Sequence, residues 1–182
     1  GLYVCSHNPD IIEDAIFTNV RIIKPVMEYF QPYSDYIGSN MEIMNVVNGH
    51  REVLFYSAHS LQAPNWINDD KQIVYNSNGL LYKYRFRTKE VKQINTGLAS
   101  NINNDHVFSF DEKLLGISNH NQEDKGVSSI YIMNPRGDSI PKKITADGVG
   151  ASYLHGISPD NKTLLFTGNR NGKYDIYGID TE

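Results

Sequence analysis

Two histidines of this chain occupy equivalent positions in two segments that resemble each other. His106 and His155 each stand three residues before a serine, Ser109 and Ser158, and each serine opens a turn that contains an aspartate. In a third such segment the same position holds Asn65. Imidazoles bind polar ligands and divalent metal ions, and an amide offers both a hydrogen-bond donor and an acceptor. These positions are therefore the first candidates for a functional site.

Further polar and aromatic residues stand beside these positions. Aromatic faces combined with amides, imidazoles and a carboxylate suit hydroxyl-rich ligands such as carbohydrates. The candidate ligand-binding residues are Asn65, Trp66, Asn104, Asp105, His106, Tyr153 and His155. His106 and His155 are also the candidate metal ligands. We identify no catalytic residue, because no nucleophile elbow, phosphate-binding loop or dinucleotide fingerprint is present.

The segments that carry these residues form a repeat. Each has a short strand, a turn centred on an aspartate, a lysine and a second apolar strand, over residues 65–77, 106–118 and 155–168. Asp111 follows Asp70 by 41 residues, and Asp160 follows Asp111 by 49 residues. An aspartate side chain closes such a turn by accepting a backbone hydrogen bond two residues on. This spacing is typical of a β-propeller blade repeat.

A third strand follows each hairpin, and a shorter polar strand follows two of them. The third strands are expected at 79–86, 128–134 and 173–179, and the fourth at 91–95 and 142–145. We therefore predict an all-β chain: a partial, about three-bladed β-propeller of four-stranded antiparallel blades over residues 40–182. The first strand of each blade lines a propeller's central channel, so equivalent positions should meet at one channel mouth.

The last repeat resembles that of the TolB-like propellers, a family with WD40-like repeats. The resemblance is carried by Ser158-Pro159-Asp160-Asn161-Lys162, Arg170-Asn171-Gly172 and Tyr174-Asp175-Ile176-Tyr177. The other two repeats depart from it, since Asn68 replaces the serine in one and Phe110 replaces the proline in the other. The resemblance implies a propeller fold and a structural hydrogen bond from Arg170 to a turn.

The first part of the chain has a different pattern. Residues 1–24 resemble the last strands of a concanavalin-like β-sandwich, as found beside carbohydrate-active modules, and the alternative is a two-stranded extension of the propeller. Residues 25–39 are expected to form a linker. Residues 40–47 and 51–57 should form a hairpin around a two-residue type I′ turn at Asn48-Gly49, and so supply two outer strands of a blade.

Composition limits the partners. The net charge of −4 argues against nucleic acid, and no apolar run is long enough to span a membrane. The basic residues Lys83, Arg85, Arg87 and Lys89 are best explained as a solvated strand face. His50, His59 and His120 are expected to be solvated or structural. The single Cys5 excludes an internal disulfide, and the cellular compartment stays open.

Three interpretations of the channel residues remain open. We favour a non-enzymatic module that binds a small molecule, carbohydrate or protein partner, without a cofactor. The alternative is a metal-dependent enzyme similar to the oligogalacturonate lyases, with His106 and His155 as ligands of a divalent metal. In the third, the polar groups only bond the channel backbone and water. Because about three blades cannot close a ring, we also expect a piece of a longer protein that self-associates through its open blade faces.

Overall fold

The computed structural model describes residues 10, 16, 28–31 and 35–181. The chain divides into two compact units, residues 1–35 and Tyr36–Glu182, and the second unit is described here by itself. The predicted sandwich strands lie outside the described residues, as do residues 25–27 and 32–34 of the predicted linker. Within the described part, no helix is long enough or apolar enough to cross a bilayer.

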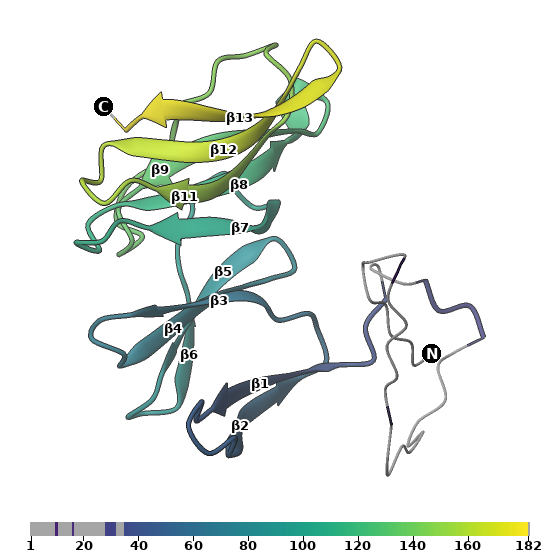
Figure 1. Ribbon diagram of the computed structural model, residues 1–182, viewed down its shortest axis with the longest axis vertical. Coiled ribbons are helices and arrows are strands. Elements are labelled where there is room, and N and C mark those ends of the chain that lie inside the picture. The colour runs from purple at the N-terminus through teal and green to yellow at the C-terminus, as the bar shows by residue number, and fades with distance from the viewer. Residues whose placement is uncertain (1–9, 11–15, 17–27, 32–34, 182) are drawn as a thin grey trace. The chain divides into compact units, whose positions relative to one another are not determined.

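The second unit is built of antiparallel strands, and η1 (Gln122–Asp124) is the one helical turn among the described residues. The hairpin and the three blades follow in chain order (Figure 1). They comprise β1 (Ser39–Met44) and β2 (Arg51–Ser57); β3 (Gln62–Ile67), β4 (Gln72–Ser77), β5 (Leu80–Arg85) and β6 (Glu90–Gln93); β7 (Ile102–Phe108), β8 (Leu115–Asn121), β9 (Val127–Met133) and β10 (Lys142–Lys143); and β11 (Ser152–Ile157), β12 (Thr163–Arg170) and β13 (Lys173–Asp180). The predicted partial propeller is confirmed. Two blades have four strands, and the third has three.

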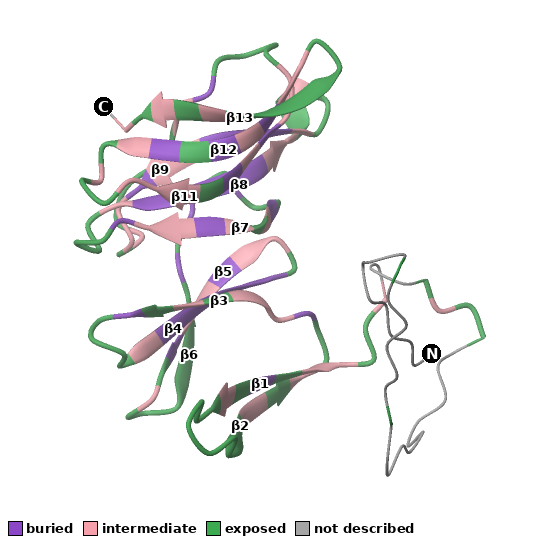
Figure 2. Cartoon of the chain, in the orientation of Figure 1, coloured by how far each residue is buried: buried purple, intermediate pink, exposed green. Residues whose placement is uncertain are grey.

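Apolar contacts between sheet faces hold the blades together. One cluster joins Val74 and Leu81 of the first blade to Leu115 and Ile117 of the second. A second cluster joins the second blade to the third. A third cluster joins the β1–β2 hairpin to the first blade. The central strands β4 and β8 are therefore almost wholly buried, as Figure 2 shows, because neighbouring sheets cover both of their faces.

The aspartate turns of the second and third blades form as the repeat predicts, with Asp111 and Asp160 each accepting from the N–H two residues on, and they also connect the blades. In the first blade the turn is closed differently, by the Lys71 N–H donating to the carbonyl of Asn68. In the second blade the Ser109 hydroxyl donates to Asp111, and this bond holds the pKa of the Asp111 carboxyl below its usual value. The residue after the aspartate then reaches the preceding blade. Both Glu112 carboxylate oxygens accept from the Asn68 N–H, at 2.8 and 2.9 Å, and Asn161 accepts from the Phe110 N–H at 2.8 Å.

The β1–β2 hairpin is confirmed, but its predicted two-residue turn is wrong. Asn48 does not take the positive φ that a type I′ turn requires, although Gly49 has φ of 72°. The strands are joined instead by a longer loop, in which Gly49 N–H donates to the carbonyl of Asn45. The Asn45 side chain causes the difference, since its oxygen accepts from the N–H groups of Val47 and Asn48 and organises the loop.

Arg170 has the structural role that the family resemblance implied. Its guanidinium donates to the carbonyls of Gly150, Ala151 and Asn169 and to the Ser152 hydroxyl. The same group lies 5.6 Å from the ring centre of Phe166 and 5.1 Å from that of Tyr177. Arg170 thereby fixes the segment that leads into β11.

Replacing Arg170 by lysine should destabilise the protein. A lysine keeps the charge, but it cannot present several donors in one plane or stack on the rings. We expect a loss of about 2–4 kcal/mol in the free energy of unfolding, measured by chemical denaturation. The matched control is Arg136→Lys in an exposed turn, which should change stability by less than about 0.5 kcal/mol. Equal stability of the two variants would contradict this role.

The outward face of the third blade leaves apolar side chains uncovered. Tyr174 is 61% exposed, Ile176 80% and Leu165 46%. Self-association through an open blade face therefore stays a prediction. Replacing Ile176 by aspartate places a charge on this face, and should shift the mass measured by light scattering toward the 20.6 kDa monomer. An unsubstituted chain that is already a monodisperse monomer would contradict the prediction.

Candidate functional site

The first strands of the three blades lie side by side, as a channel requires. β3 contacts β7, and β7 contacts β11. Asn65 pairs with Val74 in its blade and His106 pairs with Ile117, so the two residues occupy equivalent places. Asn65 Nδ2 lies 3.1 Å from His106 Nε2 across the blade boundary. The structure therefore brings this predicted pair into direct contact.

His106 is buried inside the blade boundary and is only 4% exposed. Its Nε2 is occupied by Asn65, and its Nδ1 has no hydrogen-bond partner among the described residues. Burial lowers the pKa of His106 to about 4, although the nearby carbonyls of Val74 and Asn104 act in the opposite direction. The ring is thus neutral at physiological pH and ties two blades together.

His155 stands in a different environment, although the repeat makes it equivalent to His106. A register shift between Leu154 and Gly156 makes β11 bulge at His155. Leu154 pairs with Phe166 and so takes the place that His106 has in the second blade, where it packs into the core. The bulge leaves His155 exposed.

Asp105 lies within reach of polar groups from the second and third blades. It is half-buried in a register shift of β7, between the paired residues Ile102 and His106. Burial raises the pKa of the Asp105 carboxyl, while His155, a hydrogen bond from Asn103 and His120 act in the opposite direction. The carboxylate therefore lies within electrostatic reach of imidazoles from two blades.

Two tyrosines complete this group. The Tyr153 ring meets the His120 ring edge-on, with 6.4 Å between ring centres. Burial raises the pKa of Tyr153, and Tyr174 and Asp105 raise it further, so the four groups are neighbours. Asp105, His120, Tyr153, Tyr174 and His155 are called the channel-mouth cluster below. Sequence reasoning missed His120 and Tyr174, because neither occupies a repeat position shared with the other candidates.

The remaining candidates lie apart from this cluster. Trp66 stacks on Phe86, with 5.1 Å between ring centres, on the face that packs against the β1–β2 hairpin. Asn65 alternates to the opposite face, toward His106. Asn104 is exposed beside Asp105. Among the described residues, no group of three or more His, Cys, Asp and Glu side chains is arranged to hold a metal ion.

Comparison with known proteins finds two matches that are about one third identical to this chain. No family model matches the chain. An uncharacterized protein of Agrobacterium fabrum is 34% identical over 145 residues, which cover 79% of this chain and 48% of the relative. A solved structure of a TolB candidate from Agrobacterium tumefaciens is 35% identical with a TM-score of 0.68, and the match covers 76% of this chain and 49% of that one. The chain therefore spans about half the length of these relatives.

Two more distant structures share the fold. TolB from Acinetobacter baumannii is 22% identical with a TM-score of 0.63, over 78% of this chain and 35% of that one. An oligogalacturonate lyase in complex with manganese is 16% identical with a TM-score of 0.52, over 75% of this chain and 40% of that one. The predicted resemblance is confirmed, and the described blades have the fold of a TolB-like β-propeller.

The buried His106 should make stability depend on pH. Its pKa is lowered from 6.5 to about 4 in the folded chain, so the unfolded chain binds the proton more strongly. The stability that this provides is fully present above about pH 6.5 and is lost as the pH falls toward 4, a difference of roughly 3 kcal/mol. Asp105, whose pKa is raised, acts in the opposite direction.

Replacing His106 by glutamine should therefore flatten the decline in unfolding free energy between pH 7 and pH 4.5, roughly the window in which the imidazole titrates. Chemical denaturation at several pH values measures the decline. The control is His50→Gln in the exposed turn of the first hairpin, which should show the same decline as the unsubstituted chain. An unchanged decline in the His106 variant would show that this imidazole is not its source.

Proposed function

We propose that this TolB-like propeller is a binding module that takes a ligand at the channel-mouth cluster, with a carbohydrate as the first class to test. The observation that carries the proposal is the contact between the His120 and Tyr153 rings across the boundary of two blades, with the Asp105 carboxylate within electrostatic reach of both rings. A carboxylate and imidazoles form hydrogen bonds with hydroxyl groups, and an exposed aromatic face covers the apolar face of a sugar ring.

The channel-mouth cluster has features of a binding site rather than of a packed core. His155 and Tyr174 are exposed, whereas the apolar side chains that join the blades are buried. The bulge in β11 leaves His155 exposed, within electrostatic reach of the Asp105 carboxylate. Bulges commonly re-aim a side chain next to a functional site.

A metal-dependent lyase is the alternative function. His106 would have to give up its contact with Asn65 before its Nε2 could bind a metal ion. The described residues supply no group of three suitable ligands, so further ligands would have to come from elsewhere. The likeness to the manganese-containing lyase structure supports a shared fold alone. The binding module therefore explains the channel residues with fewer assumptions.

The proposal is tested with a panel of neutral oligosaccharides on a glycan array, followed by calorimetry with the best-binding glycan. Replacing Asp105 by asparagine keeps its shape and removes the charge, and should weaken binding about tenfold. Replacing His155 by glutamine should weaken it as well. The control Asp69→Asn in an exposed turn should bind like the unsubstituted chain.

Three outcomes separate the alternatives. A glycan that binds equally to the unsubstituted chain and to both cluster variants would reject this site. Failure of every glycan to bind would reject the carbohydrate class. Mn²⁺ titrated by calorimetry tests the lyase alternative, since binding that disappears in His155→Gln would favour a metal site over the binding module.

A further inference from the structure

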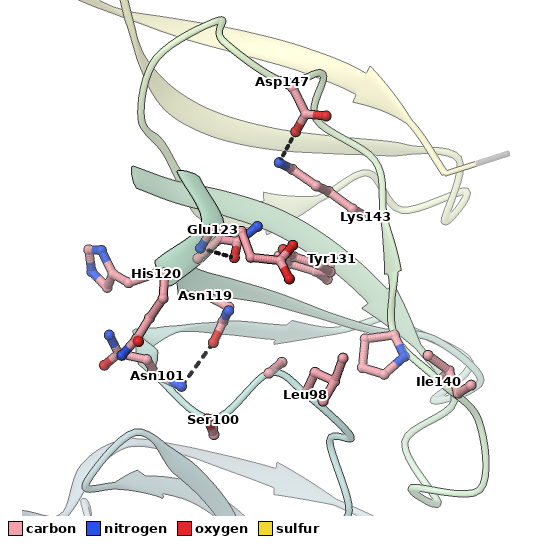
Figure 3. A pocket seen from close by; sticks show the side chains of 14 residues that line it. Leu98, Ser100, Asn101, Asn119, His120, Glu123, Tyr131, Ile140, Lys143 and Asp147 are labelled. Atoms are coloured by element: carbon pink, nitrogen blue, oxygen red, sulfur yellow. Dashed lines mark hydrogen bonds and ion pairs between the residues drawn. The ribbon is translucent and has the colours of Figure 1, made fainter. Parts of the chain in front are cut away.

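A second site lies in a cavity formed by the second blade and the segment that leads into it. It has a volume of about 560 Å³, and its wall comes from that segment, from the end of β8 with η1, and from residues around β10. All of these segments lie in the middle of the sequence, between residues 98 and 147. His120 lines the cavity too, but its ring lies at the edge of the group in Figure 3.

The charges in this cavity favour a cation. Lys143 is its one cationic side chain among the described lining residues, and it is already paired with Asp147. Burial alone would lower the pKa of Lys143, but the carboxylates of Asp147 and Asp124 and the Tyr131 hydroxyl raise it. An incoming anion would therefore compete with a carboxylate that is already in place.

Glu123 carries the carboxylate that remains for a ligand. It lines the cavity, is exposed, and forms no ion pair among the described residues. Tyr131 also lines the cavity, and in the view of Figure 3 both side chains are seen between the Lys143–Asp147 pair and Leu98. A cavity lined by a carboxylate and an aromatic ring suits a guanidinium, which can donate two parallel hydrogen bonds to a carboxylate and can stack on an aromatic ring.

Apolar side chains form the other wall. Leu98 is 95% exposed and Ile140 is 86% exposed, and Pro141 stands beside Ile140 in the lining. The methylene groups of an arginine would cover part of this wall while its charged end reaches Glu123. The nearby amide side chains of Asn101 and Gln122 can bond a peptide backbone.

We propose that this cavity binds an arginine side chain of an extended peptide segment from a partner protein. The proposal goes beyond the channel-mouth cluster, because it concerns another site and another class of ligand. It follows from three features of the lining: the Glu123 carboxylate, which forms no ion pair among the described residues, the Tyr131 ring, and the exposed wall of Leu98 and Ile140.

The test uses two blocked tetrapeptides, acetyl-Ala-Arg-Leu-Ala-amide and the same peptide with citrulline in place of arginine. Citrulline has nearly the same shape and no charge. Binding is followed by NMR shifts of the backbone amides that line the cavity, up to a peptide concentration on the order of 10 mM. The arginine peptide should bind about fivefold more tightly than the citrulline peptide.

Variants separate charge from apolar contact. Glu123→Gln should remove the preference for arginine, and Glu52→Gln on the exposed β2 strand should retain it. Leu98→Ser should weaken both peptides alike, and it should fold normally because that side chain is already exposed. In each variant, unchanged chemical shifts of the backbone amides away from the cavity confirm that the protein is folded.

Three results would overturn the proposal. They are equal binding of the two peptides to the unsubstituted chain, a preference for arginine that persists in Glu123→Gln, and the absence of cavity shifts at the highest concentration. Asp105→Asn should leave peptide binding unchanged, so this test is independent of the channel-mouth cluster.

Discussion

The packing of one sheet face on the next is the interaction on which the rest of this structure depends. No blade has a core of its own, because the buried side chains of each sheet belong to clusters shared with its neighbour. Polar contacts then set the distance and register between sheets. The Asn76 amide donates to the carbonyls of Ile102 and Asn103, and the Ser128 hydroxyl donates to that of Ser152. In each case the bonds hold the beginning of the next blade's first strand, where the candidate site residues lie.

This arrangement explains why residues far apart in sequence form one site. Asn76 fixes the backbone just before Asp105, and Ser128 and Arg170 fix the backbone just before Tyr153. These supporting groups are buried or partly buried, whereas the Asp105 and Tyr153 side chains that follow them are partly exposed. A rigid scaffold with polar groups at its edge is the usual way in which propellers and other β-folds carry binding sites.

The sequence predicted the repeat because its periodic features are local. The turn aspartates Asp111 and Asp160, the alternation of the strands and the role of Arg170 all follow from residues close in the chain, and each was found where expected. The contact between Asn65 and His106 was also predictable, since both occupy one repeat position in adjacent blades. The turn near Asn48 was not, because it depends on a side-chain bond made by Asn45.

The environment of His155 could not be predicted, for a reason that applies to repeats in general. Alignment counts residues, whereas a β-bulge adds one residue to a strand without changing the pattern around it. In the third blade Leu154 therefore occupies the buried place of His106, and His155 is turned outward. A leucine in that place contributes packing alone, whereas the imidazole of His106 loses hydration and keeps Nδ1 without a partner. The second blade therefore pays a cost in stability that the third avoids, and in return it holds Asn65 and the start of the channel in one fixed arrangement.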